Sequence, residues 1–358
     1  MYRKIIGFLE AWKKSEHRKP LILQGARQVG KTYSILEFGR THYENVVYFN
    51  FETNPKLNET FAENISPDYL IPILSHIAGQ TIVKEKTLVV FDEVQLCERA
   101  LTSLKYFCED APEYHIIVAG SLLGVAVNRA KFSFPVGKVD MKTMYPMDME
   151  EFMLALGAND LVEQIKKCFH TDTPLPSALH DAAMQLYRQY LVVGGMPECV
   201  LQFAETKDYI LVRHTQDTIL ASYLNDMSKY NNLNEIKKTR LAYDNITVQL
   251  SKKNTRFQYK LLKKGGRASE FENAIEWLCL SGIVSQVYKV EQIKKPLENY
   301  RDIDAFKIYV SDLGLLCAKK DLAANDILYM VEEINDFKGG MAENYVNVQL
   351  TINGYRTY

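Results

Sequence analysis

The sequence lacks several patterns that mark specialised classes of protein. Its six cysteines form no C-x-x-C pair and show no zinc-ligand spacing, so they give no sign of a zinc site or a redox motif. The longest nearly apolar run, Ile116 to Val127, is too short to cross a bilayer and is broken by glycine and serine. The segment from Met1 to Lys14 contains no signal-peptide core. We therefore expect a cytoplasmic protein with buried, reduced thiols and no membrane partner.

An excess of charge and internal repetition are also missing. The 43 basic and 44 acidic residues leave a net charge of −1, so a nucleic-acid surface would have to be a local patch. The 358 residues are 47% hydrophobic and 24% charged, which is typical of globular proteins, and they suffice for two or three domains.

The clearest motif that is present runs from Gly25 to Thr32. It reads G-A-R-Q-V-G-K-T and matches the phosphate-loop pattern G-x-x-x-x-G-K-[S/T], between the apolar run 20–24 and a helix-like run 33–38. Backbone N–H groups of such a loop converge on a phosphate at a helix N-terminus. Lys31 would reach the β- and γ-phosphates, and the Thr32 hydroxyl would hold Mg²⁺. The predicted nucleotide-binding residues are Gly25, Ala26, Arg27, Gln28, Val29, Gly30, Lys31, Thr32 and Tyr33.

A second strand supplies the acids that this loop needs. Residues 87–95 read T-L-V-V-F-D-E-V-Q, and their apolar run is typical of a parallel strand buried on both faces. Asp92 at its end would help to hold the Mg²⁺ shell, and Glu93 would orient or deprotonate the attacking water. The alternative is a solvated strand end that caps the next helix.

Further strands alternate with helices, as in a doubly wound α/β fold with a parallel sheet. Strands are expected at 45–52, 115–121 and 138–144, and helices at 33–43, 69–77 and 100–109. Ser121 would contact the γ-phosphate or the attacking water, cap the helix that begins near Leu122, or do both. A complete strand–helix insertion between loop and acid strand favours the additional-strand class of P-loop NTPases. No N-K-x-D motif for guanine is apparent, so ATP is the expected nucleotide.

Beyond the nucleotide site, the chain resembles prokaryotic AAA-type ATPases that pair a P-loop domain with a winged-helix module and a nuclease-like tail. The motifs that carry this resemblance are residues 25–32, residues 91–95, the stretch from Ser133 to Lys138, the segment 144–152, Gly194 to Glu198, and residues 306–316. Relatives often have Gly-Arg where this chain has Gly137-Lys138, and a lysine cannot bind a phosphate in the two-pronged way of arginine.

The resemblance implies four parts. Residues 1–150 would form the ATPase domain, 151–230 a helical lid or plain spacer, 231–325 an α+β winged helix, and 326–358 the start of a truncated restriction-endonuclease-like domain. In the last part Glu343 matches an acid of the family's first helix, although by itself it is more typical of a surface helix acid, so no nuclease chemistry is assigned to it. A helix is expected at 341–350 and a strand from 354, and the chain would be a fragment or lack the family's last domain.

Within the winged helix we expect a helix at 235–250 and a second that opens at Ser269, with Glu272 completing a capping box. Strands at 283–290 and 306–310 would form the wing around a loop at 292–304. The stretch between the helices is basic and free of acids. It contains Lys252, Lys253, Arg256, Lys260, Lys263, Lys264 and Arg267.

Three uses of that basic stretch stay open. It could bind nucleic-acid phosphates, it could contact a protein partner or a second copy of the chain, with Arg267 as an arginine finger, or it could be a solvated face. For the whole chain, the leading interpretation is a Mg²⁺-dependent ATPase with Glu93, Lys31 and Ser121 as catalytic residues and a winged helix that moves, with DNA as a candidate partner. The alternatives are an ATP-binding signalling switch with little turnover and a P-loop kinase.

Overall fold

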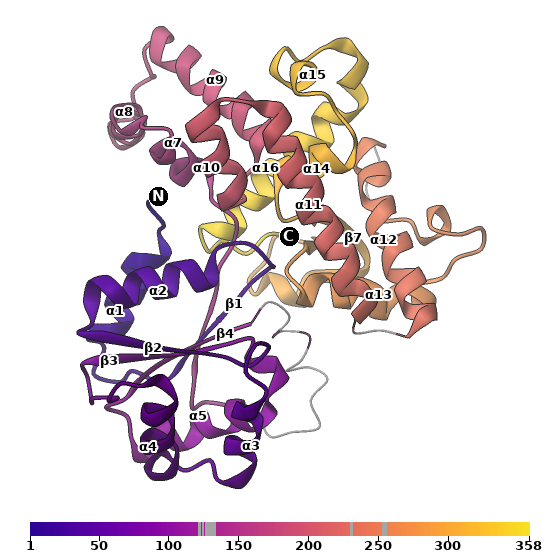
Figure 1. Cartoon of the computed structure of the whole chain (residues 1–358). Helices are drawn as coiled ribbons and strands as arrows, with labels where there is room; N and C mark the ends of the chain where they lie inside the picture. Colours follow the sequence, from indigo (N-terminus) through magenta and orange to yellow (C-terminus); the bar gives the residue numbers. More distant parts are fainter. Residues whose placement is uncertain (121–122, 124, 126–133, 230–231, 253–255) are drawn as a thin grey trace. The chain divides into compact units, whose positions relative to one another are not determined.

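A computed structural model describes residues 1–120, 123, 125, 134–229, 232–252 and 256–358 of the chain. The chain divides into two compact units, one formed by Arg3–Met144 and the other by Met1–Tyr2 with Tyr145–Tyr358 (Figure 1). We call them the N-terminal unit and the C-terminal unit. No helix in the described part of the chain has the length and apolar character needed to cross a bilayer.

The N-terminal unit is built on a parallel five-stranded sheet with the order β2-β3-β4-β1-β5. The sheet therefore places β4 between the phosphate-loop strand β1 and the acid strand β3, which confirms the additional-strand arrangement. The strands are β1 (Leu21–Gln24), β2 (Asn45–Asn50), β3 (Thr87–Asp92), β4 (His115–Ala119) and β5 (Asp140–Thr143). All five were predicted.

Helices cover both faces of this sheet (Figure 1). They are α1 (Ile5–Lys14), α2 (Lys31–His42), α3 (Lys56–Glu63), α4 (Pro67–Ala78) and α5 (Glu98–Asp110). The central strands are buried on both sides, because every residue from Leu88 to Phe91 and from Ile116 to Ala119 is fully enclosed. The sequence analysis did not predict α1 and α3. Each is amphipathic, with Leu9 and Trp12 buried on α1 and Leu57 and Phe61 on α3.

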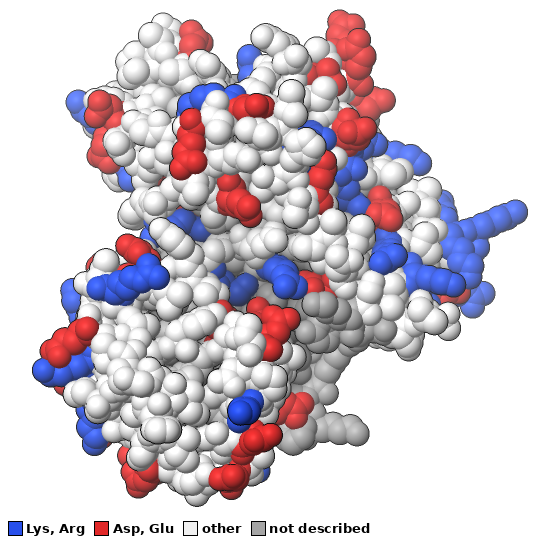
Figure 2. Space-filling view, viewed as in Figure 1, with Lys and Arg blue, Asp and Glu red and all other residues white. Residues whose placement is uncertain are grey.

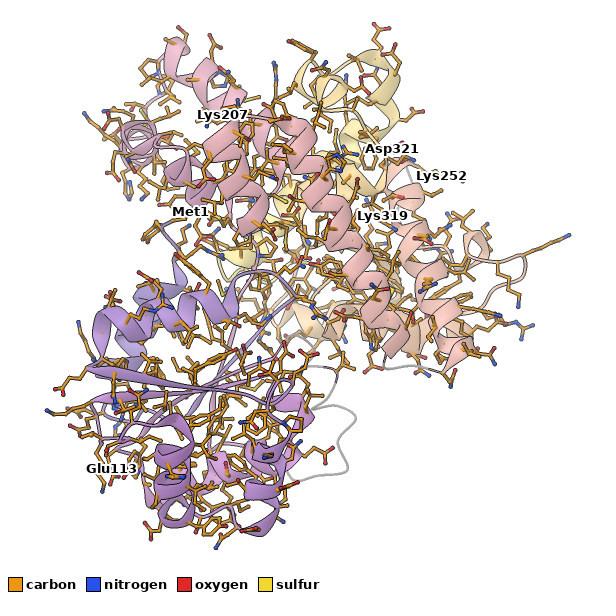
Figure 3. All side chains as sticks on the ribbon, viewed as in Figure 1. Met1, Glu113, Lys207, Lys252, Lys319 and Asp321 are labelled. Carbon is orange, nitrogen blue, oxygen red and sulfur yellow. The ribbon has the colours of Figure 1, made fainter. Side chains whose placement is uncertain are left out.

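The C-terminal unit is mainly helical, as expected for its first part. Its helices are α7 (Met149–Ala155), α8 (Asn159–His170), α9 (Ser177–Val193), α10 (Pro197–Thr206), α11 (Tyr209–Lys229), α12 (Leu233–Ser251), α13 (Ala268–Leu280), α14 (Leu313–Lys319), α15 (Ala324–Leu328) and α16 (Asn335–Ile352). At the end of α14, Lys319 binds Asp244 of α12 at 2.6 Å, and Figure 3 labels this lysine. A capping box of Asp148 and Glu151 starts α7.

The two strands predicted in residues 283–310 are present as an antiparallel hairpin of β6 (Val284–Val290) and β7 (Arg301–Val310). Strand β7 begins five residues before the expected Phe306, since Arg301 and Asp302 also pair with β6. The predicted capping box at Ser269 is wrong. Helix α13 already begins at Ala268, its N-cap is Arg267 with extended backbone, and this described terminus has no side-chain cap. Ser269 therefore lies inside the helix.

The end of the chain differs from the expectation. Helix α16 begins at Asn335 rather than Met341, and the described residues 355–358 form no strand. A strand needs a partner for its backbone groups, whereas here the Tyr355 N–H donates to the Leu350 carbonyl and the Thr357 hydroxyl to Asn347. The tail folds back on its own helix.

A buried carboxylate, Asp312, connects two of the motifs that carry the resemblance, Gly194 to Glu198 and residues 306–316, within the C-terminal unit. It accepts N–H bonds from Gly195 at 2.6 Å and from Leu315 at 2.8 Å. Burial raises the pKa of Asp312 to about 6, against the opposing effect of these backbone bonds. A Cβ on Gly194, whose φ is +75°, would lie 2.3 Å from this carboxylate. The two motifs therefore pack directly against each other. Glycine is required at Gly194 because a larger residue would overlap the Asp312 carboxylate.

Candidate nucleotide site

The phosphate loop lies between β1 and α2, at the carboxyl edge of the sheet. Gly25 has φ +145°, and a Cβ there would lie 2.1 Å from the Met144 carbonyl oxygen, so no other residue fits. Gly30 is the N-cap of α2 with a left-handed backbone, and Gln28 is also left-handed at φ +66°. The loop therefore has the left-handed turns and the position before a helix N-terminus that are typical of a phosphate-binding loop.

Lys31, the first residue of α2, is 7% exposed. Its ammonium donates to the Gly25 carbonyl at 2.9 Å and to the Ala26 carbonyl at 2.8 Å. Burial lowers the pKa of Lys31 to about 8, although the nearby Glu93 and Asp92 favour its charged form. The loop thus holds a desolvated cation at its centre, where it can bind phosphate oxygens.

Thr32 and Asp92 meet as the motif spacing predicted. The Thr32 hydroxyl donates to Asp92 Oδ2 at 2.8 Å, and Asp92 Oδ1 accepts the Glu93 N–H at 2.9 Å. Asp92 is 5% exposed at the end of β3. These residues fit Mg²⁺, which prefers a hydroxyl and a carboxylate together with phosphate and water oxygens. In the described part of the chain no cluster of three His, Cys, Asp or Glu could hold a metal ion. A metal ion held by Thr32 and Asp92 would take its other ligands from phosphate and water oxygens.

Glu93 sits directly after the acid strand in an uncommon backbone conformation, with φ +51°. Burial raises the pKa of its carboxyl, and a hydrogen bond from the Gln95 amide acts in the opposite direction. Gln95 also lies beside the end of β4, because a Cβ on Gly120 would be 2.3 Å from its Oε1. That buried oxygen has no hydrogen-bond partner among the described residues. A carboxyl with a raised pKa suits a general base.

Other predicted residues of the loop have distinct surroundings. Ala26 and Val29 are buried, Arg27 is half-buried, and Tyr33 is 63% exposed at the start of α2. Residues 25–33 therefore gather with Asp92 and Glu93 at one edge of the sheet. Ser121 lies outside the described residues.

The sequence analysis missed several polar residues of this edge. The Tyr48 hydroxyl donates to Asp92 at 2.8 Å, and Asn50 donates to Tyr48 at 3.1 Å. Buried Arg3 donates to the Val29 carbonyl of the loop at 3.0 Å. Tyr48 and Asn50 end the strand beside the acid strand, which is a signal that sequence could have supplied. Arg3 offers no such signal.

Lys138 lies away from this edge. It precedes β5, which runs parallel to β1, so it lies toward the opposite end of the strands from the loop. Its ammonium binds Glu109 at 2.8 Å. Neither observation favours a nucleotide contact.

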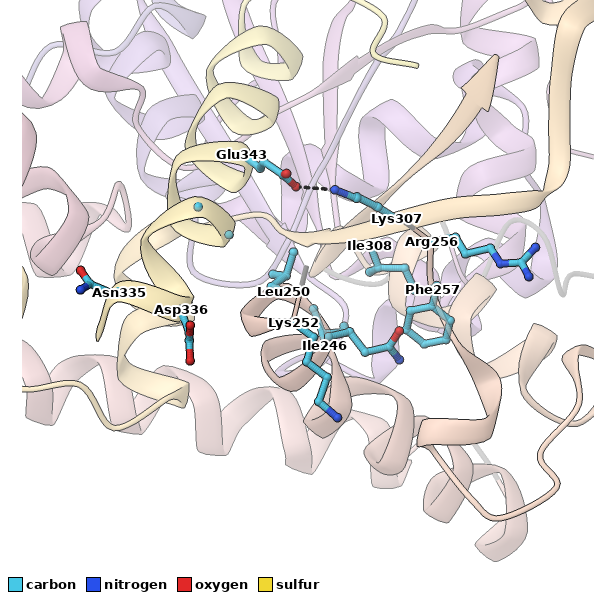
Figure 4. A pocket seen from close by; sticks show the side chains of 13 residues that line it. Ile246, Leu250, Lys252, Arg256, Phe257, Lys307, Ile308, Asn335, Asp336 and Glu343 are labelled. Carbon is cyan, nitrogen blue, oxygen red and sulfur yellow. Dashed lines mark hydrogen bonds and ion pairs between the residues drawn. The ribbon is translucent and has the colours of Figure 1, made fainter. Parts of the chain in front are cut away.

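The basic stretch lies in the C-terminal unit and divides into two environments. Lys252 and Arg256 line a cavity of about 280 Å³ between α12, β7 and α16, which also contains Asp336 and Glu343. Figure 4 shows the ion pair of Lys307 and Glu343 there, at 2.7 Å. Mixed charge makes this cavity a poor site for a polyanion. Lys260, Lys263, Lys264 and Arg267 are exposed near α13, and Lys253 lies outside the described residues.

Two family models match the chain. Residues 17–153 match an AAA domain. This AAA-type domain contains the phosphate loop and the acids Asp92 and Glu93 described above. Residues 184–326 match a domain of unknown function, DUF8612. No match to the chain was found among curated proteins.

The chain also matches several solved structures. A Walker-type ATPase of Pyrococcus abyssi is 13% identical, with 89% of this chain and 95% of that chain covered and a TM-score of 0.54. The ORC2 protein of Aeropyrum pernix is 13% identical, with 95% of each chain covered and a TM-score of 0.41. The RuvB Holliday junction branch migration motor of Thermotoga maritima is 14% identical, with 79% and 87% covered and a TM-score of 0.35. The first likeness establishes a P-loop ATPase fold.

Proposed function

We propose that this protein is a Mg²⁺-dependent ATPase. The observation that carries the proposal is the convergence of Lys31, Thr32, Asp92 and Glu93 at one sheet edge, with Thr32 and Asp92 joined at 2.8 Å. Phosphoryl transfer requires a cation that binds the phosphates, oxygen ligands for the metal ion and a carboxylate that orients the attacking water. These four residues supply all three.

Each residue has a separate task in this proposal. Loop N–H groups and the Lys31 ammonium bind and orient the phosphates. Thr32 and Asp92 would hold Mg²⁺, and the ion would supply positive charge to stabilise the phosphates during transfer. Glu93 accepts a proton from the attacking water once its carboxylate is released from the Gln95 amide, which donates to it in the structure.

An ATP-binding switch with little turnover is the second candidate. It is favoured by the contact of Glu93 with Gln95, because a carboxylate that stays bound to an amide is a poor base. Under this alternative, nucleotide binding by itself would signal to a partner.

We further propose that the nucleotide cycle moves the C-terminal unit, with 151–230 as a helical lid and 231–325 as a winged helix. The support is the order α12, a short turn at Tyr259–Leu261, α13 and the β6–β7 hairpin. The assignment of 326–358 to a further domain stays a prediction. In the structure, α16 packs on α12 and β7 within the same compact unit.

DNA is the partner we propose for the winged helix, bound through the basic residues near α13 and the wing residues Lys294 and Lys295. Figure 2 shows Lys and Arg side chains gathered over the part of this unit that contains α12 and α13. A protein partner or a second copy of the chain that uses Arg267 as an arginine finger is the alternative.

ATP turnover with Mg²⁺, with and without duplex DNA, tests the proposal. Lys31→Ala should lose nucleotide binding and turnover, because the phosphates lose their cation. Glu93→Gln should keep binding and lose about 100-fold or more in rate. Glu98→Gln, at an exposed glutamate of α5, is the matched control and should behave as the parent protein.

The products and rates separate the candidates. Free phosphate that depends on Glu93 supports the ATPase. Tight ATP binding without turnover, with or without DNA, would favour the switch. A phosphorylated small molecule in place of free phosphate would identify a kinase.

A further inference from the structure

The Asp92 carboxylate has a partner that the usual tasks of such a site do not require. The phenol of Tyr48, on the neighbouring strand β2, donates to Asp92 Oδ2 at 2.8 Å. This is the same oxygen that accepts the Thr32 hydroxyl at 2.8 Å. A metal bound between Thr32 and Asp92 would therefore have a carboxylate whose orientation depends on Tyr48.

Asn50 fixes the direction of this bond. Its side-chain oxygen accepts the N–H groups of Glu52 at 2.8 Å and Thr53 at 3.0 Å, so its amide nitrogen faces the other way. That nitrogen donates to the Tyr48 oxygen at 3.1 Å. Because the phenol oxygen accepts from Asn50, its own proton is directed to Asp92.

The phenol of Tyr48 also keeps its proton, and so stays a hydrogen-bond donor, near neutral pH. Burial raises the pKa of Tyr48 to about 12, and the bond to Asp92 acts in the same direction. The side chain is nevertheless 40% exposed, so this hydroxyl could have been satisfied by water. Its bond to Asp92 is thus an orienting contact of a partly exposed group and is not forced by burial.

We propose that Tyr48, oriented by Asn50, is a positioning residue that holds Asp92 toward Thr32 and thereby sets the affinity of the site for Mg²⁺ in the presence of ATP. The proposal rests on the proposed ATPase function. Partners that orient metal-holding carboxylates typically contribute tenfold or more to metal affinity. Tyr48 itself touches neither metal nor nucleotide in this proposal.

The test is Mg²⁺ titration of a fluorescent ATP analogue bound to the full chain. Tyr48→Phe should raise the Mg²⁺ concentration at half-maximal binding by about tenfold. Nucleotide binding in EDTA should change less than about twofold, and turnover should recover at high Mg²⁺. Asn50→Ala keeps the phenol of Tyr48 but removes the hydrogen bond that directs its proton to Asp92. This variant should raise the Mg²⁺ concentration at half-maximal binding by a smaller factor.

Tyr43→Phe is the matched control. It removes a tyrosine hydroxyl that bonds His115 at 2.7 Å in the same unit, away from Asp92. It should leave the Mg²⁺ midpoint unchanged whatever it does to thermal stability. A purely structural role of Tyr48 would lower the melting temperature without moving the midpoint.

An unchanged or lower Mg²⁺ midpoint in Tyr48→Phe would overturn the inference while leaving the ATPase proposal intact. If Tyr48→Phe does not fold, Asn50→Ala decides by the same criterion. Absence of Mg²⁺-dependent ATP binding by the parent protein would instead contradict the proposed function itself, so the two failures are distinguishable.

Discussion

Lys31 is a residue at which burial and phosphate binding favour opposite charge states. Burial lowers its pKa from 10.5 to about 8, so the folded chain releases this proton more readily than the unfolded chain. Between pH 8 and 10.5 the unfolded chain binds more protons, and the nucleotide-free protein gains stability from this group as pH rises. Phosphates need the charged form, so nucleotide binding has the reverse dependence.

We therefore predict that ATP affinity falls as pH rises above about 8, by about fivefold between pH 8 and pH 9. The measurement is the dissociation constant of a fluorescent ATP analogue from pH 7 to 9.5. Lys31→Met cannot titrate and should bind weakly with no such dependence. An affinity of the parent protein that stays constant to pH 9.5 would contradict the prediction.

Some residues of the site could be predicted from the sequence and others could not. Lys31, Thr32 and Asp92 belong to motifs in which spacing reports geometry, and the structure brings them together. Tyr48 and Gln95 act on those residues only through contacts made after folding. The place of Tyr48 near a strand end puts it at this sheet edge, but no motif in the sequence predicts which residue Tyr48 or Gln95 contacts.

At the scale of elements, the phosphate loop depends on backbone geometry more than on side chains. Gly25→Ala should destabilise the AAA-type domain by about 2 kcal/mol and abolish nucleotide binding, because the new Cβ would overlap the Met144 carbonyl. Thermal melting and nucleotide titration measure both effects.

Gly7→Ala on α1 is the matched control. Nothing lies within 4 Å of a Cβ there, so this change should stabilise the helix by about 0.5–1 kcal/mol. A Gly25→Ala protein that melts and binds nucleotide as the parent does would show that the loop tolerates another backbone path.

The strands β1 to β4 were predictable because each contains a short apolar run, and a buried parallel strand requires that composition. Strand β5 (D-M-K-T) has no buried residue and was predicted from the alternation of apolar and polar residues instead. Helix ends were less so. Ser269 and Glu272 have capping-box spacing, yet α13 begins earlier, at Ala268. The capping box that does form uses Asp148 and Glu151. The spacing of residues in the sequence shows where a helix could begin with a capping box. Tertiary packing decides at which of these positions the helix begins.

At the scale of the whole molecule, charge is nearly balanced, so any polyanion affinity must come from a local surface. The exposed lysines and arginine near α13 form the proposed surface. Duplex DNA affinity should fall uniformly across sequences when Lys264 and Arg267 are both changed to alanine, because phosphate contacts carry no base information.

The salt dependence provides the sharper measurement. If both residues contact phosphates, the slope of log affinity against log salt should become less steep by about 1.8 in the double variant. Changing Lys56 and Lys105, two exposed lysines of the N-terminal unit, removes the same charge and should leave the slope unchanged. Equal effects of both pairs would mean that only net charge matters.

The sequence by itself determined the P-loop, the strand composition of the parallel sheet and the two acids at the end of β3, since each depends on local spacing or on burial of a short run. Tertiary structure alone decided which residues orient those acids, where α13 begins, and that Asp312 joins two distant glycine motifs. Those features arise from contacts between segments far apart in the chain. Their energies depend on which groups folding brings together, and residue order alone does not contain that information.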